Sequence, residues 1–228
     1  MSGLSHPRTA AVVLGGGSGS RVGAEVNKVL LPLAGRPVLA WSLETVRSLE
    51  YVVRVVVVCR PDDRAAVRPM LVEGERLVDG GAERHDSEWN ALRALAPDIL
   101  GDEVDVVAIH DGARPLASHD LWTAVVDAAA AAGGAIPAHP LHALVHADGS
   151  AAAGLVGVQT PQAFRAGDLL AAYAAADEDG FRGTDTASCL ERYGALRIAG
   201  VEAPATNLKI TFPEDVRVAE RLLLRSEE

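Results

Sequence analysis

Short apolar runs alternate with segments of helical periodicity along most of the chain. Ala10 to Leu14 and Val52 to Cys59 are nearly continuous apolar runs, which is typical of strands buried on both faces. Val38 to Leu49 carries apolar residues at helical spacing after Pro37. The same pattern predicts further strands at 76–78, 104–109 and 195–199, and further helices at 62–71, 83–96, 118–132, 165–176, 185–193 and 213–225. Alternating strands and helices predict an α/β fold with a Rossmann-like, doubly wound and mostly parallel sheet.

Prolines and one irregular stretch interrupt this alternation. Pro97 is expected to end the helix that begins at Glu83, because a proline removes a backbone hydrogen bond from a helix interior. Residues 137–157 contain proline, histidine and Asp148-Gly149 and lose the helical period, which predicts a short β-hairpin arm that turns at Asp148-Gly149. Residues 1–228 show no internal repeat and are expected to form a single domain that includes this arm.

The composition limits the class of partner. A net charge of −10 argues against binding a nucleic-acid polymer through a basic face. The two cysteines, Cys59 and Cys189, are too few for a disulfide framework and lack metal-ligand spacing. The first nine residues lack the apolar core of a signal peptide, and no apolar run approaches the roughly 20 residues of a membrane span. We expect a cytoplasmic protein without a membrane partner.

A glycine-rich loop follows the first predicted strand. Gly15, Gly16, Gly17 and Gly19 remove side chains where a backbone must approach a bulky anion, which leaves N–H groups free to bind phosphate. The loop has neither the Gly-Lys-Ser/Thr ending of a P-loop nor the G-x-G-x-x-G pattern of dinucleotide-binding proteins. On glycine content alone, a tight strand-to-helix turn without a ligand remains an alternative.

Charged residues beside the predicted strand ends favour phosphate chemistry. Arg21 and Lys28 follow the glycine loop, and nucleotidyl transfer needs positive charge fixed where negative charge develops on the phosphate. Taken singly, each of them would more often be a solvated surface cation. Asp111 comes at the end of a predicted strand, where a carboxylate can meet ribose or a Mg²⁺ ion on a triphosphate, or simply cap a turn.

Several sequence blocks carry a resemblance to a known family. They are V-L-G-G-G-S-G-S-R followed by N-K, D-G-G-A-E-R-H-D-S (79–87), H-D-G-A-R-P (110–115), T-P-Q-A-F (160–164), T-D-T-A-S (184–188) and N-L-K-I-T (207–211). In this order they resemble the 2-C-methyl-D-erythritol 4-phosphate cytidylyltransferases of the non-mevalonate isoprenoid pathway. Ribitol 5-phosphate cytidylyltransferases share most of the blocks. The glycine loop alone is a weak signal, and the joint occurrence of the later blocks is a strong one.

The resemblance implies a nucleotidyltransferase fold, CTP and a small sugar-alcohol phosphate as substrates, Mg²⁺ as cofactor and pyrophosphate as product. It implies in-line attack on the α-phosphorus without a covalent enzyme intermediate. The roles it assigns are catalytic for Arg21, Lys28 and Lys209; nucleotide binding for Gly15, Gly16, Gly17, Gly19, Gly81, Ser87, Asp111, Gly112 and Arg114; acceptor binding for Asp111, Thr160 and Lys209; and metal binding for Asp111. A homodimer is expected through the arm, because an extended hairpin is hard to stabilise alone.

The chain departs from the family pattern at the acceptor site. His139-Pro140-Leu141-His142 replaces the usual acceptor-binding residues, and Ala152 stands where the family has an arginine that binds acceptor phosphate in the neighbouring subunit. Arg165 or a histidine at 139, 142 or 146 is a candidate replacement cation. Pro140 argues against a zinc site made by these histidines, because it breaks helical spacing. Asn27 replaces the usual proline before Lys28 and is expected to loosen the loop that holds this lysine.

Three functions therefore remain open. The leading one is transfer of a cytidylyl group to 2-C-methyl-D-erythritol 4-phosphate. The second is the same reaction with another polyol phosphate, such as ribitol 5-phosphate. The third is a non-catalytic nucleotide-binding paralogue that has lost the acceptor site.

Overall fold

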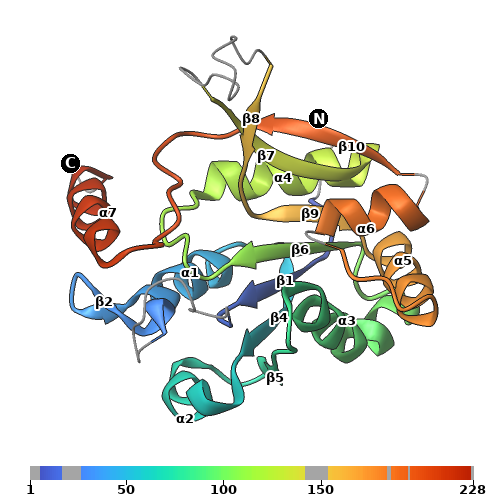
Figure 1. Cartoon of the computed structure of the whole chain (residues 1–228), viewed down its shortest axis with the longest axis horizontal. Coiled ribbons are helices and arrows are strands. Elements are labelled where there is room, and N and C mark those ends of the chain that lie inside the picture. Colours follow the sequence, from blue (N-terminus) through green and yellow to red (C-terminus); the bar gives the residue numbers. More distant parts are fainter. Residues whose placement is uncertain (1–5, 17–26, 142–153, 184–185, 195, 227–228) are drawn as a thin grey trace, which may run out of the picture.

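A mixed sheet with helices on both faces forms the framework of the molecule (Figure 1). The computed structural model describes residues 6–16, 27–141, 154–183, 186–194 and 196–226. The sheet has the order β10-β7-β9-β6-β1-β4-β5, and β8 pairs with β7 outside this path. Neighbouring strands on the path are parallel except where β9 pairs with β6 and β7. The predicted doubly wound, mostly parallel α/β fold is confirmed.

The elements follow the predicted alternation closely. The strands are β1 (Thr9–Leu14), β2 (Pro32–Leu33), β3 (Arg36–Pro37), β4 (Val52–Cys59), β5 (Arg76–Asp79), β6 (Val106–Asp111), β7 (Gly133–Pro140), β8 (Val156–Val158), β9 (Gln162–Arg165) and β10 (Arg197–Glu202). The α-helices are α1 (Val38–Arg47), α2 (Arg64–Val67), α3 (Arg84–Leu100), α4 (His119–Ala132), α5 (Ala166–Glu178), α6 (Thr186–Tyr193) and α7 (Pro213–Ser226). Three 3₁₀ helices are η1 (Lys28–Leu30), η2 (Pro61–Asp63) and η3 (Arg68–Met70).

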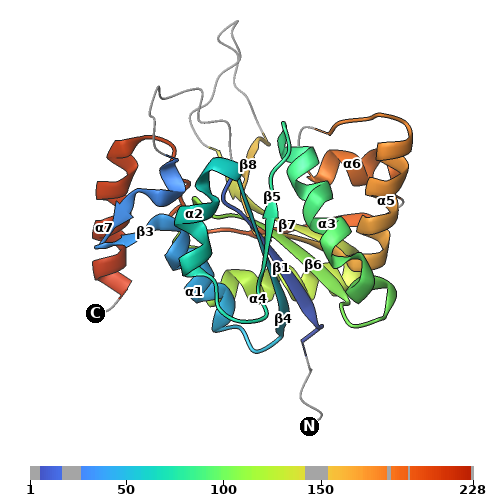
Figure 2. The same ribbon diagram turned by 90° about the horizontal axis from the view of Figure 1, so that it is seen from below.

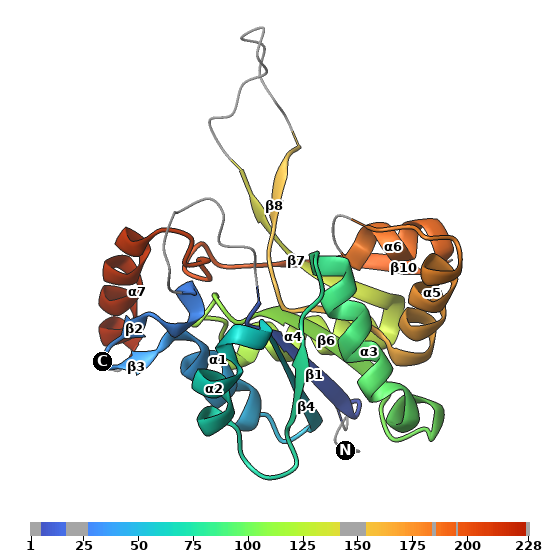
Figure 3. The ribbon, with the colours of Figure 1, turned by 60° about the horizontal axis from the view of Figure 1, so that its bottom comes forward.

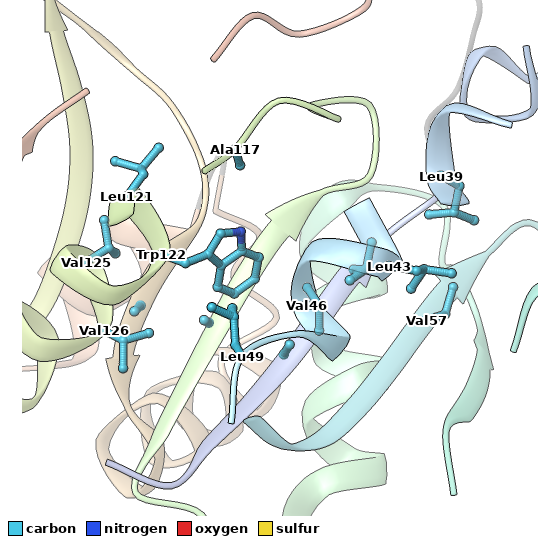
Figure 4. Close-up of a cluster of buried hydrophobic side chains, with 14 of the residues drawn as sticks. Leu39, Leu43, Val46, Leu49, Val57, Ala117, Leu121, Trp122, Val125 and Val126 are labelled. Carbon is cyan, nitrogen blue, oxygen red and sulfur yellow. The ribbon is translucent and has the colours of Figure 1, made fainter. Parts of the chain in front are cut away.

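Both faces of the central strands are buried, which explains their uninterrupted apolar sequences. On one face, Ala11 and Val13 of β1 belong to a core with α1 and α4, and on the other, Ala10 and Val12 belong to a core with α3, α5 and α6. Figure 2 shows α3, α5 and α6 together on one side. Figure 4 shows the fully buried Trp122 of α4 reaching toward α1 and the residues that follow it. Truncating such a side chain to alanine typically costs about 3–5 kcal/mol of stability.

The expectation that Pro97 ends its helix is wrong. Helix α3 continues through Pro97 to Leu100. Pro97 removes only one N–H group, and the last turn is held by other contacts: Gly101 N–H donates to the Pro97 carbonyl at 3.0 Å, and Asp98 pairs with Arg54 and Arg76. Three short strands were also not predicted from the sequence, namely β9 and the paired β2 and β3.

The base of the predicted arm is confirmed. Strand β8 pairs antiparallel with the end of β7, with Ala138 opposite Val158 and Pro140 opposite Val156. Figure 3 shows this pair projecting from the body of the molecule. The expected turn at Asp148-Gly149 lies outside the described residues, as does Ala152.

The C-terminal segment returns to the middle of the sheet before α7 begins. Ile210 is fully buried in a small apolar cluster with Leu33 and Val38, to which α7 contributes Ala219. The Ile210 N–H donates to the Ala113 carbonyl at 2.8 Å, just after β6. Figures 1 and 3 show α7 on the opposite side of the molecule from α5 and α6. No helix in the described part of the chain is long and apolar enough to cross a membrane.

Candidate active site

The candidate residues gather where β1, β4 and β6 end. In the parallel register, Leu14 at the end of β1 lies beside Val58 of β4 and beside Asp111, the last residue of β6. Ligands of open α/β sheets bind beyond the carboxyl ends of such strands. The topology therefore brings Gly15, where the glycine loop begins after β1, next to the end of β6 at Asp111.

Asp111 is the centre of a cluster of ion pairs. Its Oδ1 accepts a hydrogen bond from Nη1 of Arg84 at 2.6 Å, and its Oδ2 accepts one from Nζ of Lys209 at 2.6 Å. Nε of Arg114 lies 4.0 Å from the same Oδ2. Burial alone would raise the pKa of the Asp111 carboxyl, but the charges of Arg84 and Lys209 outweigh it and hold this pKa well below its usual range. Asp111 is thus a fixed anion that orients surrounding cations.

Arg84 at the start of α3 connects Asp111 to a buried carboxylate. Its Nε donates to Oε1 of Glu88 at 2.7 Å, while Glu88 is only 1% exposed. Glu88 also accepts hydrogen bonds from the Tyr173 hydroxyl and from Thr186 Oγ1. Because the guanidinium is held between two carboxylates, its direction is fixed without any ligand.

A network of polar contacts sets the position of Lys209. The preceding Asn207 is buried, and its Nδ2 donates to Gln159 Oε1 at 2.7 Å and to the Thr160 carbonyl at 3.0 Å. Nη1 of Arg114 donates to the Asn207 carbonyl at 2.7 Å. The N-L-K-I-T block is therefore tied to the strand ends on both sides of Lys209.

Thr160 supports Asp111 through its hydroxyl. Its Oγ1 accepts a hydrogen bond from the Asp111 N–H at 2.9 Å and lies 3.1 Å from Nδ1 of His110. Burial lowers the pKa of His110 to about 4, so the ring is neutral near pH 7. Its Nε2 faces the Arg114 carbonyl at 3.2 Å and must carry the proton, which leaves Nδ1 to accept from the hydroxyl. The Thr160 hydroxyl therefore donates its one hydrogen bond to Nδ1 of His110, and this bond holds its oxygen in place to accept from the Asp111 N–H.

A cavity of about 310 Å³ opens beside this cluster. It is lined by Gly16, Arg60, Pro61, Gly80, Gly81, Ala82, Glu83, Arg84 and Ser87. Ser87 Oγ accepts from the Gly81 N–H at 3.1 Å and donates to the Glu83 carbonyl at 3.0 Å. A Cβ atom on Gly81 would lie 2.2 Å from Cβ of Asp86, so only glycine fits there. The structure brings Gly16, Gly81 and Ser87 together in one hollow, as expected of a shared binding site.

The remaining predicted residues lie around this hollow or outside the described residues. Gly15 is buried and donates to the Val58 carbonyl at 2.7 Å, while Gly112 donates to the Leu14 carbonyl at 2.9 Å. A Cβ atom on Gly112 would lie 2.8 Å from Cδ1 of Leu39, which gives this glycine a packing role. Lys28 begins η1. Gly17, Gly19 and Arg21 are outside the described residues.

Two expectations about individual residues are wrong. Arg165 cannot replace the missing acceptor-site cation, because antiparallel β9 places it opposite Val106, at the other end of β6 from Asp111. Five residue steps along a strand separate them by about 17 Å, and Arg165 instead donates to the Ala130 carbonyl at 3.0 Å. Asn27 does not loosen the attachment of Lys28 to the fold, since Asn27 is buried and hydrogen-bonded by both ends of its amide.

Among the arm histidines proposed as replacement cations for the acceptor site, only His139 lies in the described part of the chain. His139 lies on β7 and its Nδ1 is 3.1 Å from the Ala203 carbonyl. His142 and His146 are outside the described residues. The divergence predicted for the acceptor site therefore stays a prediction.

Proteins of one enzyme family are similar to this chain over nearly its whole length. The sequence model of the 2-C-methyl-D-erythritol 4-phosphate cytidylyltransferase family matches residues 9–225. The chain belongs to this family. A relative in Cereibacter sphaeroides that carries the family name is 42% identical over 225 residues, which cover 94% of this chain and 96% of the relative. Another in Bacillus velezensis is 35% identical over 224 residues, which cover 93% of this chain and 94% of the relative.

Solved structures of the family share the fold. The 4-diphosphocytidyl-2C-methyl-D-erythritol synthase of Anaerococcus prevotii is 26% identical, with a TM-score of 0.80 over 96% of this chain and 99% of that chain. The 2-C-methyl-D-erythritol 4-phosphate cytidylyltransferase of Thermus thermophilus is 28% identical, with a TM-score of 0.73 over 93% and 97%. The resemblance inferred from the sequence blocks is thereby confirmed.

Sequence reasoning missed two cations of this cytidylyltransferase-family site. Arg84 lies inside the D-G-G-A-E-R-H-D-S block, but only its glycine and serine neighbours were assigned roles. Arg60 follows β4 directly and lines the cavity. Its signal was available, because a charged residue at the end of a buried parallel strand is what singled out Asp111.

Proposed function

We propose that this chain transfers the cytidylyl group of CTP to 2-C-methyl-D-erythritol 4-phosphate and releases pyrophosphate. The observation that carries the proposal is the pairing of Asp111 with both Lys209 and Arg84 beside the cavity, in a member of the cytidylyltransferase family. The glycines that line the cavity leave room for a planar base, and the cations beside it suit phosphates.

The arrangement divides the reaction between two sets of residues. The cavity with Gly16, Gly81 and Ser87 takes the cytosine, and Lys28 with Arg21 holds the triphosphate. Lys209 takes the acceptor phosphate. An oxygen of that phosphate attacks the α-phosphorus, and the bond from this phosphorus to the bridging β-phosphate oxygen breaks as pyrophosphate leaves. The protein supplies alignment and fixed positive charge, which are the main needs of such a transfer.

Mg²⁺ fits this site as an ion that arrives with CTP. Mg²⁺ is usually held by one or two carboxylates together with substrate phosphates. Among the described residues, no group of three or more His, Cys, Asp and Glu side chains forms a ready cage. Asp111 is the carboxylate available to it, although both of its oxygens already accept hydrogen bonds from cations. When bound, the ion neutralises negative charge on the triphosphate.

A substrate panel tests the proposed function. Pyrophosphate release is measured with CTP, ATP, GTP and UTP, each with 2-C-methyl-D-erythritol 4-phosphate, ribitol 5-phosphate and glycerol 3-phosphate. We expect release with CTP and the methylerythritol phosphate at a rate at least about tenfold above every other pair. Faster turnover of ribitol 5-phosphate would replace the acceptor, and no turnover with any pair would show a non-catalytic paralogue.

We infer that the chain forms a homodimer through the arm. Four apolar side chains near the arm's base are 41–50% exposed, namely Leu141, Leu155, Val156 and Val158. Apolar side chains gathered on a projecting hairpin favour burial against a second copy. We expect a dimer by light scattering at micromolar concentration and a monomer for Val156→Asp. The matched control is Val218→Asp on α7, which is 52% exposed and should leave the dimer intact. A monomeric wild type contradicts this proposal.

We also infer a cytoplasmic location. Cys59 and Cys189 are both buried and unpaired, which agrees with a reducing compartment.

A further inference from the structure

The side-chain amide of Asn27, the residue before Lys28, makes three hydrogen bonds. Asn27 is 7% exposed, and its Nδ2 donates to the Gly15 carbonyl at 2.7 Å and to Oδ2 of Asp63 at 2.7 Å. Its Oδ1 accepts from the Val29 N–H at 3.3 Å, which caps η1. These partners require the nitrogen and the oxygen of the amide in their assigned places, because two are acceptors and one is a donor.

Asp63 connects this amide to the wall of the cavity. It is 7% exposed at the end of η2, and Arg60 donates to both of its oxygens, from Nε at 2.7 Å and from Nη2 at 3.1 Å. A two-pronged arginine–carboxylate pair fixes direction as well as distance. Arg60 itself lines the cavity with Gly16. The chain Arg60–Asp63–Asn27 therefore runs from the cavity wall to the residue that precedes Lys28.

Asn27 also ties the start of η1 to Gly15 at the end of β1. Gly15 is held to β4 by its N–H and to Asn27 by its carbonyl. The start of η1 is consequently fixed relative to β1 and β4 by side-chain contacts of a single amide. An amide at this position does more than fill space, since an apolar residue would leave the buried Asp63 with one partner fewer and the Gly15 carbonyl without this donor.

We propose that Asn27 and Asp63 are positioning residues, which hold Lys28 in place for the triphosphate and link it to the wall of the base cavity. This inference rests on the proposed role of Lys28 in cytidylyl transfer. A displacement of about 1 Å in a phosphate-binding cation is enough to cost a large part of its effect on the transition state.

Exchange of the two side-chain types tests the link. Asn27→Asp keeps an acceptor for the Val29 N–H but places two carboxylates side by side, and we expect kcat to fall about tenfold while KM for CTP changes by less than about threefold. Adding Asp63→Asn removes the repulsion between the two carboxylates, but the Asp63 oxygen that faces Asn27 also accepts from Nε of Arg60, and the Gly15 carbonyl still lacks its donor. We therefore expect kcat of the double variant to recover only in part, to about threefold above that of Asn27→Asp. Asp62→Asn, the exposed neighbour on η2, is the matched control and should behave as wild type.

A second measurement separates positioning from loss of folding. In a Lys28→Ala background, Asn27→Asp should cause no further loss of kcat, because the lysine through which Asn27 acts is absent. Circular dichroism and Tm establish that each variant is folded. If folded Asn27→Asp retains wild-type kcat, or if its loss adds in full to that of Lys28→Ala, the inference is overturned while the proposed function stands. A wild type without CTP-dependent pyrophosphate release overturns both.

Discussion

Replacing Lys28 by alanine is expected to lower kcat by about 10²-fold or more, the scale of losing one preorganised charge contact in a transition state. Lys28 lies at the start of η1, beside the glycine loop and directly after Asn27. Negative charge develops on the phosphates as pyrophosphate leaves, so the amine acts more strongly in the transition state than in the ground state. Steady-state pyrophosphate release at saturating CTP measures the effect.

Controls distinguish this lysine from a general surface cation. Lys28→Arg keeps the charge with a different shape and should retain more activity than Lys28→Ala. Arg68→Ala removes an exposed arginine of η3 and should leave kcat unchanged. The same loss is expected for Arg21→Ala on the family resemblance. A fall of less than about threefold for Lys28→Ala would contradict the assigned role.

Asp111→Asn is expected to lower kcat/KM by about 10²-fold, because an amide cannot hold two cations as a carboxylate does. The amide nitrogen of the asparagine would replace either Oδ2, which accepts from Lys209, or Oδ1, which accepts from Arg84, so one of these two cations would lose its acceptor. The freed lysine would no longer be aligned with the acceptor phosphate. The effect is measured with subsaturating 2-C-methyl-D-erythritol 4-phosphate.

A double-mutant cycle shows whether Asp111 acts through Lys209. Lys209→Met alone should cause a loss of similar size, and the double variant should be little worse than either single one, because both changes break the same pair. The control is Asp120→Asn, an exposed carboxylate in the first turn of α4. Fully additive losses would mean that the two residues serve separate steps.

The central strands could be predicted from the sequence because burial on both faces leaves a direct mark. Val52 to Cys59 was predicted with the bounds that β4 has in the structure. Strand β9 has no comparable apolar run in the sequence. Its four residues run directly into α5, so a short apolar pair at Ala163 and Phe164 looks like the start of a helix. The antiparallel pairing with β6 depends on partners that are distant in sequence.

The sequence indicated which residues belong to the site better than it indicated which of them contact one another. Position at a strand end was enough to single out Asp111. No pattern along the chain shows that Arg84 turns toward Asp111 from another element, or that Asn27 finds Asp63 across 36 positions. The candidate cation Arg165 failed for the same reason, since closeness to Thr160 in sequence became separation across the sheet once β9 ran antiparallel.

Lysine amines are rare in this chain, and both of them belong to the candidate site. The sequence contains 21 lysine and arginine residues, and only Lys28 and Lys209 are lysines. One begins η1 beside the glycine loop, and the other is bound to Asp111. Guanidinium groups stay protonated and resist acylation, whereas a lysine amine is a nucleophile once it loses its proton. Apart from the N-terminal amine, a reagent that acylates amines can therefore react only within the candidate site, so ordinary lysine chemistry becomes active-site-directed labelling in this protein.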